Sequence, residues 1–272
     1  MTIESFKPLI DSHVGYRVKS VDILGEGITT PLVKLIVQTC SELTTIVLCS
    51  FSINDSAVIT IAQHCHMLEN MSNFSNQTTR ISLLALSERG LPLKTLYFSR
   101  IPNISTADIA RRCSHALSCI RNFSTIDYYS NDLQASFIIP YLTGLTSLEF
   151  GCGCKYIPIL IQHCHKLNRI RVYEKSNSVG DILSLCRNNP LLQEFTYNGQ
   201  RGITDTALIE LIHACPHIHT LYLPYETDIT DTGILALSEH CTQLKELVIG
   251  KCQRISEPAV LLLLQRCRQL RV

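Results

Sequence analysis

The sequence predicts an α/β solenoid in which short parallel strands alternate with helices along the chain. Three observations predict this fold: an apolar pattern that recurs about every 25 residues, a polar signal where each helix starts, and a cysteine where the helix ends. A unit of this length holds one strand and one helix, which cannot bury their apolar faces alone, so successive units must stack. We therefore expect binding to use a surface rather than a deep pocket.

The strand of each unit is marked by the pattern apolar-x-x-apolar-x-apolar. Because side chains alternate along a strand, the last two apolar residues face the core together. The pattern starts at Val18, Leu43, Leu68, Leu93, Leu117, Leu145, Leu167, Leu192, Ile218, Leu244 and, truncated, at Leu270. About ten strand-helix units thus account for residues 15–272, with an irregular insertion around 122–141. Residues 1–14 are expected to form the tail of a preceding repeat helix or an N-terminal extension.

A capping residue and an acid mark the start of the predicted helices. In the stretch from Ile203 to Ala207, Thr204 can accept a hydrogen bond from a free amide, and Asp205 favours the positive end of the helix dipole. The corresponding caps of other units are Asn54, Thr230 and Ser256.

A cysteine ends most of these helices, usually three residues before the next strand pattern. This junction leaves little room for a larger side chain, so we expect reduced thiols that pack as small apolar groups. The cysteines are Cys40, Cys65, Cys113, Cys164, Cys215, Cys241 and Cys267, and Gly90 and Asn189 replace them in two units.

Composition and charge exclude several classes of function. The chain carries 24 basic and 23 acidic residues, a formal net charge of +1, and so lacks the charge of a nucleic-acid or membrane-surface protein. Residues 1–20 lack the apolar core of a signal peptide, and no apolar run approaches the roughly 20 residues of a membrane span. We expect a soluble cytoplasmic protein, with the nucleus as the alternative.

The combined pattern resembles the cysteine-containing class of leucine-rich repeats found in the substrate-binding part of F-box proteins. One unit carries it as Cys241, Leu244, Leu247, Ile249, Cys252, Ile255, Ser256, Glu257 and Ala259. A second carries it as Cys215, Ile218, Leu221, Leu223, Ile229, Thr230, Asp231 and Gly233. The resemblance implies a horseshoe like that of ribonuclease inhibitor, with parallel strands on the concave face and helices outside.

The same resemblance implies a non-catalytic protein-binding module, which selects substrates for an SCF-type ubiquitin ligase in ubiquitin-dependent protein catabolism. About 14 residues precede the first unit, fewer than the roughly 40 of an F-box. Ligase adaptor subunits would therefore bind through sequence outside this stretch. The alternative is a stand-alone repeat scaffold or inhibitor that regulates a protein partner without a ligase. The last strand stops at Val272 without a polar cap, so we expect a partner or a continuation to cover this end.

The candidate binding residues lie on the predicted concave face. The residue between the last two apolar positions of each strand must point away from the core, and the next such position lies two residues further on. The candidates are Tyr97, Arg121, Glu149, Arg171, Tyr173, Thr196, Asn198, Tyr222 and Val248. Tyrosine and arginine are enriched at binding hot spots, and Glu149 with Arg171 could form a neutral pair or a specificity clamp. The alternative is that these residues only solvate the sheet.

Metal and catalytic sites are disfavoured. Cys152 and Cys154, with the stretch His163 to His165, hold enough ligands for zinc, but Cys164 is already explained as a buried helix end. Adjacent histidine and cysteine, as in His64-Cys65, indicate a solvated histidine beside a buried cysteine rather than a catalytic dyad. We expect no metal, no cofactor and no enzymatic activity.

Overall fold

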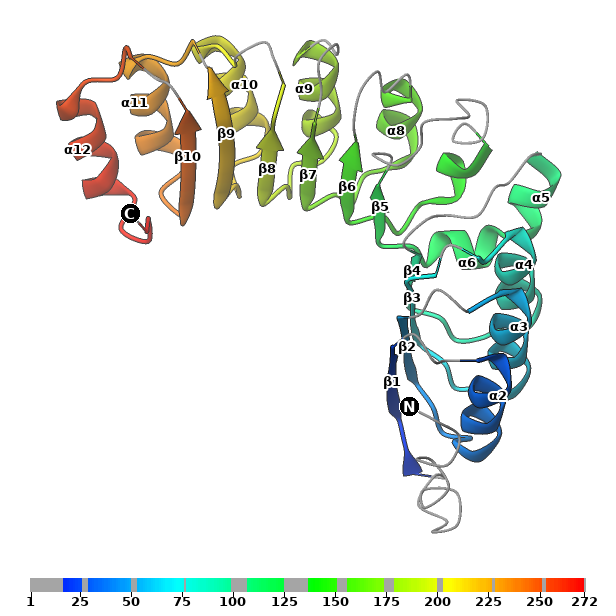
Figure 1. Cartoon of the computed structure of the whole chain (residues 1–272). Helices are drawn as coiled ribbons and strands as arrows, with labels where there is room; N and C mark the ends of the chain where they lie inside the picture. The colour runs from blue at the N-terminus through cyan, green and yellow to red at the C-terminus, as the bar shows by residue number, and fades with distance from the viewer. Residues whose placement is uncertain are drawn as a thin grey trace. The chain divides into compact units, whose positions relative to one another are not determined.

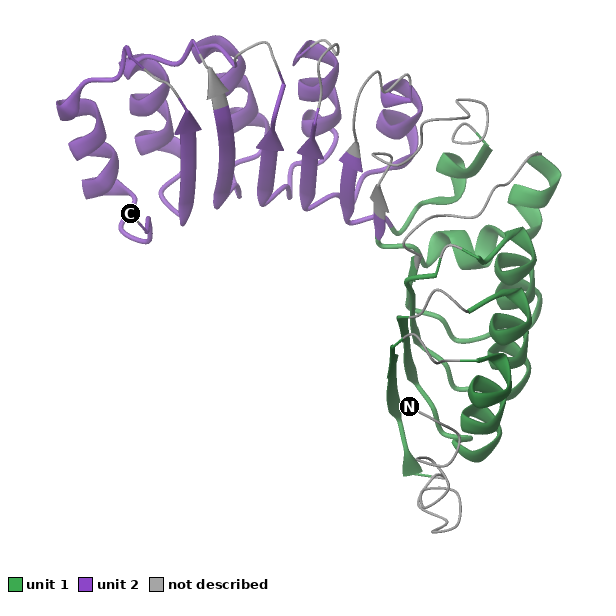
Figure 2. Cartoon of the chain, in the orientation of Figure 1, with its two compact units in different colours: residues 1–121, 133–144 green, residues 122–132, 145–272 purple. Residues whose placement is uncertain are grey.

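The computed structural model describes residues 17–25, 29–49, 53–75, 77–98, 107–124, 137–150, 156–173, 179–199, 203–226, 228–250 and 253–271. The chain divides into two compact units, shown in Figure 2: unit 1 comprises residues 1–121 and 133–144, and unit 2 comprises residues 122–132 and 145–272. The predicted N-terminal segment 1–14 lies outside the described residues, as does the stretch 125–136 of the predicted insertion. One continuous solenoid over 15–272 stays a prediction.

Unit 1 contains a four-stranded parallel sheet in the order β1-β2-β3-β4. The strand order in the sheet is the order in the chain, and a helix follows each of the first three strands (Figure 1). The elements are β1 (Ser20–Leu24), α2 (Thr30–Thr39), β2 (Thr45–Cys49), α3 (Asp55–His64), β3 (Asn70–Asn73), α4 (Arg80–Glu88), β4 (Thr95–Phe98), α5 (Ala107–Arg112), α6 (Ser114–Ser118) and the 3-10 helix η2 (Ile139–Tyr141).

Unit 2 repeats the arrangement with a six-stranded parallel sheet in the order β10-β9-β8-β7-β6-β5. Helices α8 to α12 pack each against the next in a separate layer, as Figure 1 shows. The elements are β5 (Asn122–Ser124), β6 (Ser147–Phe150), α8 (Ile157–His163), β7 (Arg169–Val172), α9 (Val179–Arg187), β8 (Glu194–Tyr197), α10 (Asp205–Ala214), β9 (Thr220–Glu226), α11 (Asp231–His240), β10 (Glu246–Gly250) and α12 (Glu257–Arg266). The predicted α/β solenoid of parallel strand-helix units is confirmed.

The core lies between the strands and the helices, at the positions that the strand pattern predicts. Ile46 pairs in register with Met71, which pairs with Leu96, and all three side chains are buried. Leu221 and Leu223 are likewise buried on β9, whereas Tyr222 between them is exposed. The period of two therefore separates a core face from an open face, which we define as the face of the sheet opposite the helices.

The repeated cysteines are buried at the helix ends, as predicted. All seven have an exposed fraction of 0 or 1%, and none forms a disulfide. Burial raises the pKa of Cys164 and Cys241 to about 12, so both thiols stay protonated and unreactive near neutral pH. The thiol of Cys267 also donates a hydrogen bond to the carbonyl oxygen of Cys241, in the preceding strand-helix repeat, at 3.3 Å. Cys267 therefore fills space at its helix end and contacts the neighbouring strand-helix repeat.

The acid in the first turn of helices α3, α10 and α11 does more than favour the helix dipole. Asp205 accepts hydrogen bonds from the amide and hydroxyl of Thr230, the cap of the next helix, at 2.9 and 2.7 Å. Asp231 binds the cap Ser256 in the same way, at 2.6 and 2.7 Å. In unit 1, Asp55 accepts bonds from the amide and hydroxyl of Thr79, and from Ser82. We call this recurring contact the acid-cap clamp, because it joins one strand-helix repeat to the next repeat in the same unit.

The clamp makes stability depend on pH. Burial raises the pKa of Asp55, but hydrogen bonds from Ser82 and Thr79 outweigh it and hold this pKa below its ordinary value. A hydrogen bond from Arg169 likewise lowers the pKa of Glu194. A carboxyl with a depressed folded-state pKa stabilises the protein above its unfolded-state pKa, and this contribution is lost as the pH falls through the folded-state value. The free energy of unfolding should therefore fall between about pH 5 and pH 2.

Urea denaturation across this pH range, compared between the wild type and Asp55→Asn, tests the clamp. The variant should be less stable at pH 7 and should lose less stability on acidification, because it has no carboxylate to protonate. Asp22→Asn, which changes an exposed aspartate of β1, is the control and should keep the wild-type pH dependence. Parallel pH profiles for the wild type and Asp55→Asn would contradict the clamp.

The strand pattern is irregular near Leu117. Leu117 lies in α6, and Ile120 forms an isolated parallel bridge with Leu96 in the predicted register. The next regular strand, β5, begins inside the predicted insertion and pairs Phe123 with Leu148. Ile120 is therefore in register with β4, whereas the residue in register with β6 comes three positions later. The first segment of unit 1 ends at Arg121, between these two residues.

Candidate functional site

A pocket of about 560 Å³ lies on the open face of unit 2. Its lining comes from four neighbouring strands, β7 to β10, and from residues directly beside them. The lining residues are Arg171, Tyr173, Glu194, Thr196, Asn198, His219, Thr220, Tyr222, Lys245 and Glu246. Five of them, Arg171, Tyr173, Thr196, Asn198 and Tyr222, are among the predicted binding residues, so the structure brings these five together. We call this feature the open-face pocket.

The predicted row of outward-pointing residues is continuous across unit 2. Strand register places Glu149 opposite Arg171, Arg171 opposite Thr196, Thr196 opposite Tyr222, and Tyr222 opposite Val248. Neighbouring strands lie about 4.8 Å apart, so side chains in this row can contact one ligand. Tyr222 and Val248 are 41% and 40% exposed, which leaves apolar surface open at one end of the row.

Arg171 places a cation in the centre of the row. Its guanidinium forms no close ion pair or hydrogen bond with any residue that the structure describes, although its charge helps to lower the pKa of Glu194 in the same pocket. Glu149 is next to Tyr173: burial raises the pKa of Tyr173, and the charge of Glu149, which accepts a hydrogen bond from the phenol, raises it further. Tyr173 therefore stays protonated, and Arg171 is available to a carboxylate or a carbonyl of a partner.

Asn198 places an unsatisfied acceptor in the same pocket. Its side-chain oxygen Oδ1 is buried and has no hydrogen-bond partner among the described residues. Leaving such a group unpaired costs about 1 to 3 kcal/mol, which a donor from a ligand would recover if the amide of Asn198 turned its oxygen into the pocket. An amide or a hydroxyl of a bound polypeptide is a suitable donor. The pocket thus combines the cation of Arg171, a buried acceptor without a partner among the described residues, and exposed aromatic surface.

A closed ion pair lies beside these available groups. Arg169 donates to both carboxylate oxygens of Glu194, with 2.8 Å between Nη2 and Oε1. Glu194, Thr220 and Glu246 each precede a row residue by two positions and share its face. Strand periodicity is the signal that identifies these lining residues, because positions two residues apart on a strand share one face.

Two of the predicted residues, Tyr97 and Arg121, belong to unit 1 and do not line the open-face pocket. Tyr97 is half-buried on β4, with its ring centroid 4.8 Å from that of Phe74. Arg121 donates to the backbone carbonyl oxygens of Ser118, at 2.8 Å, and of Lys94. These contacts hold the turn after α6, so the guanidinium of Arg121 is already engaged.

The disfavoured chemical sites gain no support. The described residues contain no group of three or more side chains suited to a metal ion, and Cys152 and Cys154 lie outside them. In the His64-Cys65 pair, burial raises the pKa of Cys65 to about 12, which leaves no thiolate for nucleophilic attack. No helix in the described part of the chain has the length and apolar content to cross a membrane.

Comparison with known proteins identifies the fold. No protein-family model and no curated protein sequence matches the chain. Rad7, in the crystal structure of the yeast Rad7 and Elc1 complex, matches with a TM-score of 0.62 and 16% identity over 100% of this chain and 70% of that one. LegL7, a leucine-rich repeat-containing protein from Legionella pneumophila, matches with a TM-score of 0.53 and 13% identity over 94% of this chain and 92% of that one. The chain therefore has a leucine-rich repeat fold.

Proposed function

We propose that this chain is a non-catalytic protein-recognition module that binds its partner on the open face of unit 2. The observation that carries the proposal is the open-face pocket, where, among the described residues, Arg171 forms no hydrogen bond or close ion pair and the buried oxygen of Asn198 has no donor. Exposed Tyr173 and Tyr222 flank these groups and are of the residue type enriched at binding hot spots. Solenoids of stacked repeats commonly bind proteins over such a face, which supports the proposal.

We further propose that the partner is a substrate of an SCF-type ubiquitin ligase, and that ubiquitin transfer is carried out by other subunits. The support is the resemblance of the cysteine-containing repeats to the substrate-binding part of F-box proteins. The similarity in fold to Rad7, whose structure was solved in a complex with Elc1, is compatible with an adaptor partner. Such an adaptor would bind outside the repeats, and the complex would act in the cytoplasm or the nucleus.

The double variant Arg171→Ala, Tyr222→Ala should weaken partner binding by about 1 to 4 kcal/mol if the two residues are hot spots. Both side chains lie on the open face, so thermal unfolding should change little. The measurement is a pull-down from cell extract with the wild-type chain, followed by calorimetric titration of the recovered protein against both forms.

The control is the variant Arg80→Ala, Leu235→Ala, which removes two exposed side chains from helices α4 and α11. It should bind the partner as the wild type does. Equal affinity of the Arg171→Ala, Tyr222→Ala variant and the wild type would move the site elsewhere. Ligase subunits in the wild-type pull-down would support the receptor function, and their absence with a bound partner would favour a regulatory scaffold.

A further inference from the structure

The open-face pocket of unit 2 changes in chemistry from one strand to the next. On β7, Arg171 places a guanidinium in the outward-pointing row, and strand register puts Thr196 beside it and Tyr222 beside Thr196. Tyr222 and Val248, on β9 and β10, are 41% and 40% exposed. The row therefore begins with a cation on β7, continues with a small hydroxyl on β8, and ends with apolar surface on β9 and β10.

The acids nearest to Arg171 already have partners. Both carboxylate oxygens of Glu194 accept hydrogen bonds from Arg169, which lowers the pKa of Glu194. Glu149 accepts a hydrogen bond from the phenol of Tyr173. Arg171 itself forms no close ion pair or hydrogen bond with a described residue. An anionic group of a ligand can therefore meet Arg171 without displacing a described contact.

The charges around Arg171 match a ligand with a single negative charge. With histidine neutral, the charged lining residues are two bases and two acids, namely Arg171, Lys245, Glu194 and Glu246. Sites that bind phosphorylated residues use clusters of arginine, whereas one planar guanidinium can hold a carboxylate through two parallel hydrogen bonds. Glu149, directly opposite Arg171 on β6, would repel a second negative charge. The pocket therefore favours a carboxylate over a phosphate.

Strand spacing sets the distance between the cation and the aromatic ring. Arg171 on β7 and Tyr222 on β9 are separated by one strand, so their backbones lie about 10 Å apart. A polypeptide in the polyproline II conformation has three residues per turn, so residues i and i+3 point to the same side about 9 Å apart. In a β-strand, residues i and i+3 point to opposite sides. A polyproline II segment therefore fits this spacing, and a β-strand does not.

We propose that the open-face pocket binds a polyproline II segment of the partner protein, in which an aspartate or glutamate lies three residues from an apolar residue. The carboxylate pairs with Arg171, and the apolar side chain packs against Tyr222 and Val248. Grooves lined by aromatic residues are a recurring surface for polyproline II ligands, and Tyr173 and Tyr222 line this pocket. The inference rests on the proposed function, because it assigns a sequence to the partner that binds the open face.

Selection of a random peptide library on the immobilised full chain tests the proposal. Enriched peptides should carry an acid and an apolar residue three positions apart. Selection on Arg171→Gln should lose the acid and keep the apolar residue, whereas selection on Tyr222→Ala should lose the apolar residue and keep the acid. In a fluorescence titration, the best peptide should bind Arg171→Gln at least about tenfold more weakly than the wild type.

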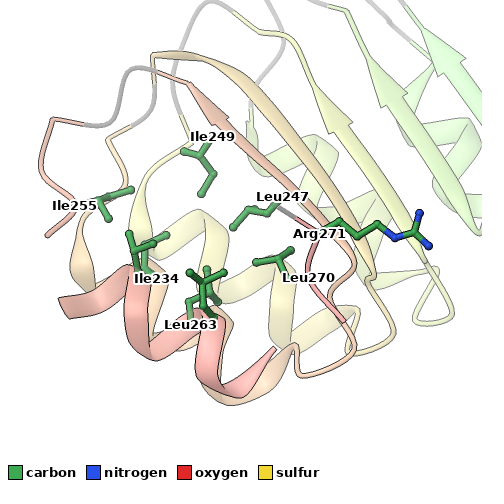
Figure 3. A pocket seen from close by; sticks show the side chains of 9 residues that line it. Ile234, Leu247, Ile249, Ile255, Leu263, Leu270 and Arg271 are labelled. Atoms are coloured by element: carbon green, nitrogen blue, oxygen red, sulfur yellow. The ribbon is translucent and has the colours of Figure 1, made fainter. Parts of the chain in front are cut away.

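Arg271→Gln is the matched control, because it removes an arginine from a different pocket of unit 2. Arg271 lines an apolar pocket of about 430 Å³ between β10 and α12. Figure 3 shows its guanidinium directed away from the aliphatic side chains of that pocket, such as Leu247 and Leu263. Peptides selected on Arg271→Gln should therefore keep both the acid and the apolar residue. Circular dichroism checks that each variant is folded, and Arg171→Lys, which keeps the charge but not the planar fork, should bind with intermediate affinity.

The proposal is overturned by a selection that enriches no peptide, by a different spacing, or by an acid that persists on Arg171→Gln or is lost on Arg271→Gln. Binding that becomes more than about tenfold tighter when phosphoserine replaces the acid would also overturn it, in favour of a phosphorylated partner. Protection of Tyr173 and Tyr222 from oxidation by the recovered partner tests the proposed function separately. If both tyrosines are protected and the selection fails, the open face binds a partner but not through this sequence.

Discussion

Replacing Cys241 with aspartate should lower the free energy of unfolding by about 3 to 5 kcal/mol. The side chain is 1% exposed, and burial raises the thiol pKa to about 12, which shows how poorly this junction tolerates charge. A carboxylate there would either stay charged without a partner or take up a proton at a free-energy cost. Urea denaturation at pH 7 measures the loss.

The neighbouring substitution Thr242→Asp is the control for this prediction. Thr242 is exposed one residue further on, so the same charge should change the free energy of unfolding by less than about 0.5 kcal/mol. Equal denaturation midpoints for Cys241→Asp and Thr242→Asp would mean that the helix-end cysteine is not a core residue.

Replacing Asn189 with leucine should cost a similar amount, about 3 to 5 kcal/mol, for a different reason. Asn189 stands where most units have cysteine, and its side chain is fully hydrogen-bonded in the core. Its Nδ2 donates to the carbonyl oxygens of Cys164 and Leu185 at 3.0 and 2.9 Å, and its Oδ1 accepts from the amide of Leu167 at 2.8 Å. Leucine would leave these three backbone groups buried without partners.

Asn189→Cys provides the matched comparison. A thiol can still donate a hydrogen bond to a carbonyl oxygen of the preceding strand-helix repeat, as Cys267 does to Cys241 at 3.3 Å. Asn189→Cys should therefore lose clearly less stability than Asn189→Leu in the same urea titration. If the leucine variant is as stable as the wild type, the hydrogen bonds of Asn189 contribute nothing and this part of the account is wrong.

The repeat period was sufficient to predict most of the fold. Strand position, the buried residues such as Ile46 and Leu221, and the buried cysteines all follow from short-range rules that each unit repeats. The cap Thr204 was also predictable, and its hydroxyl accepts a bond from the amide of Ala207 at 3.3 Å. The same period placed Arg171, Thr196 and Tyr222 in one row, because parallel strands in sequence order align equivalent positions.

Other features depend on contacts that the period does not specify. The sequence predicts that Asp205 acts on the dipole of its own helix, whereas its hydrogen-bond partner Thr230 lies 25 residues away in the next strand-helix repeat. Arg121 was placed on the binding row, but the turn after α6 directs its guanidinium to backbone carbonyls. The missing donor at Asn198 results from local burial of one oxygen atom. Such details need coordinates, because one side chain can satisfy the same pattern in several ways.

We expect a partner protein to cover the open face of unit 2. Hydroxyl-radical footprinting of the chain, alone and with the protein recovered by pull-down, tests it most directly because tyrosine side chains report their own exposure. We predict that oxidation of Tyr173 and Tyr222 slows in the complex, while oxidation of the exposed Met67, which follows α3 in unit 1, stays unchanged. Unchanged oxidation of both tyrosines in a saturated complex would contradict the claim.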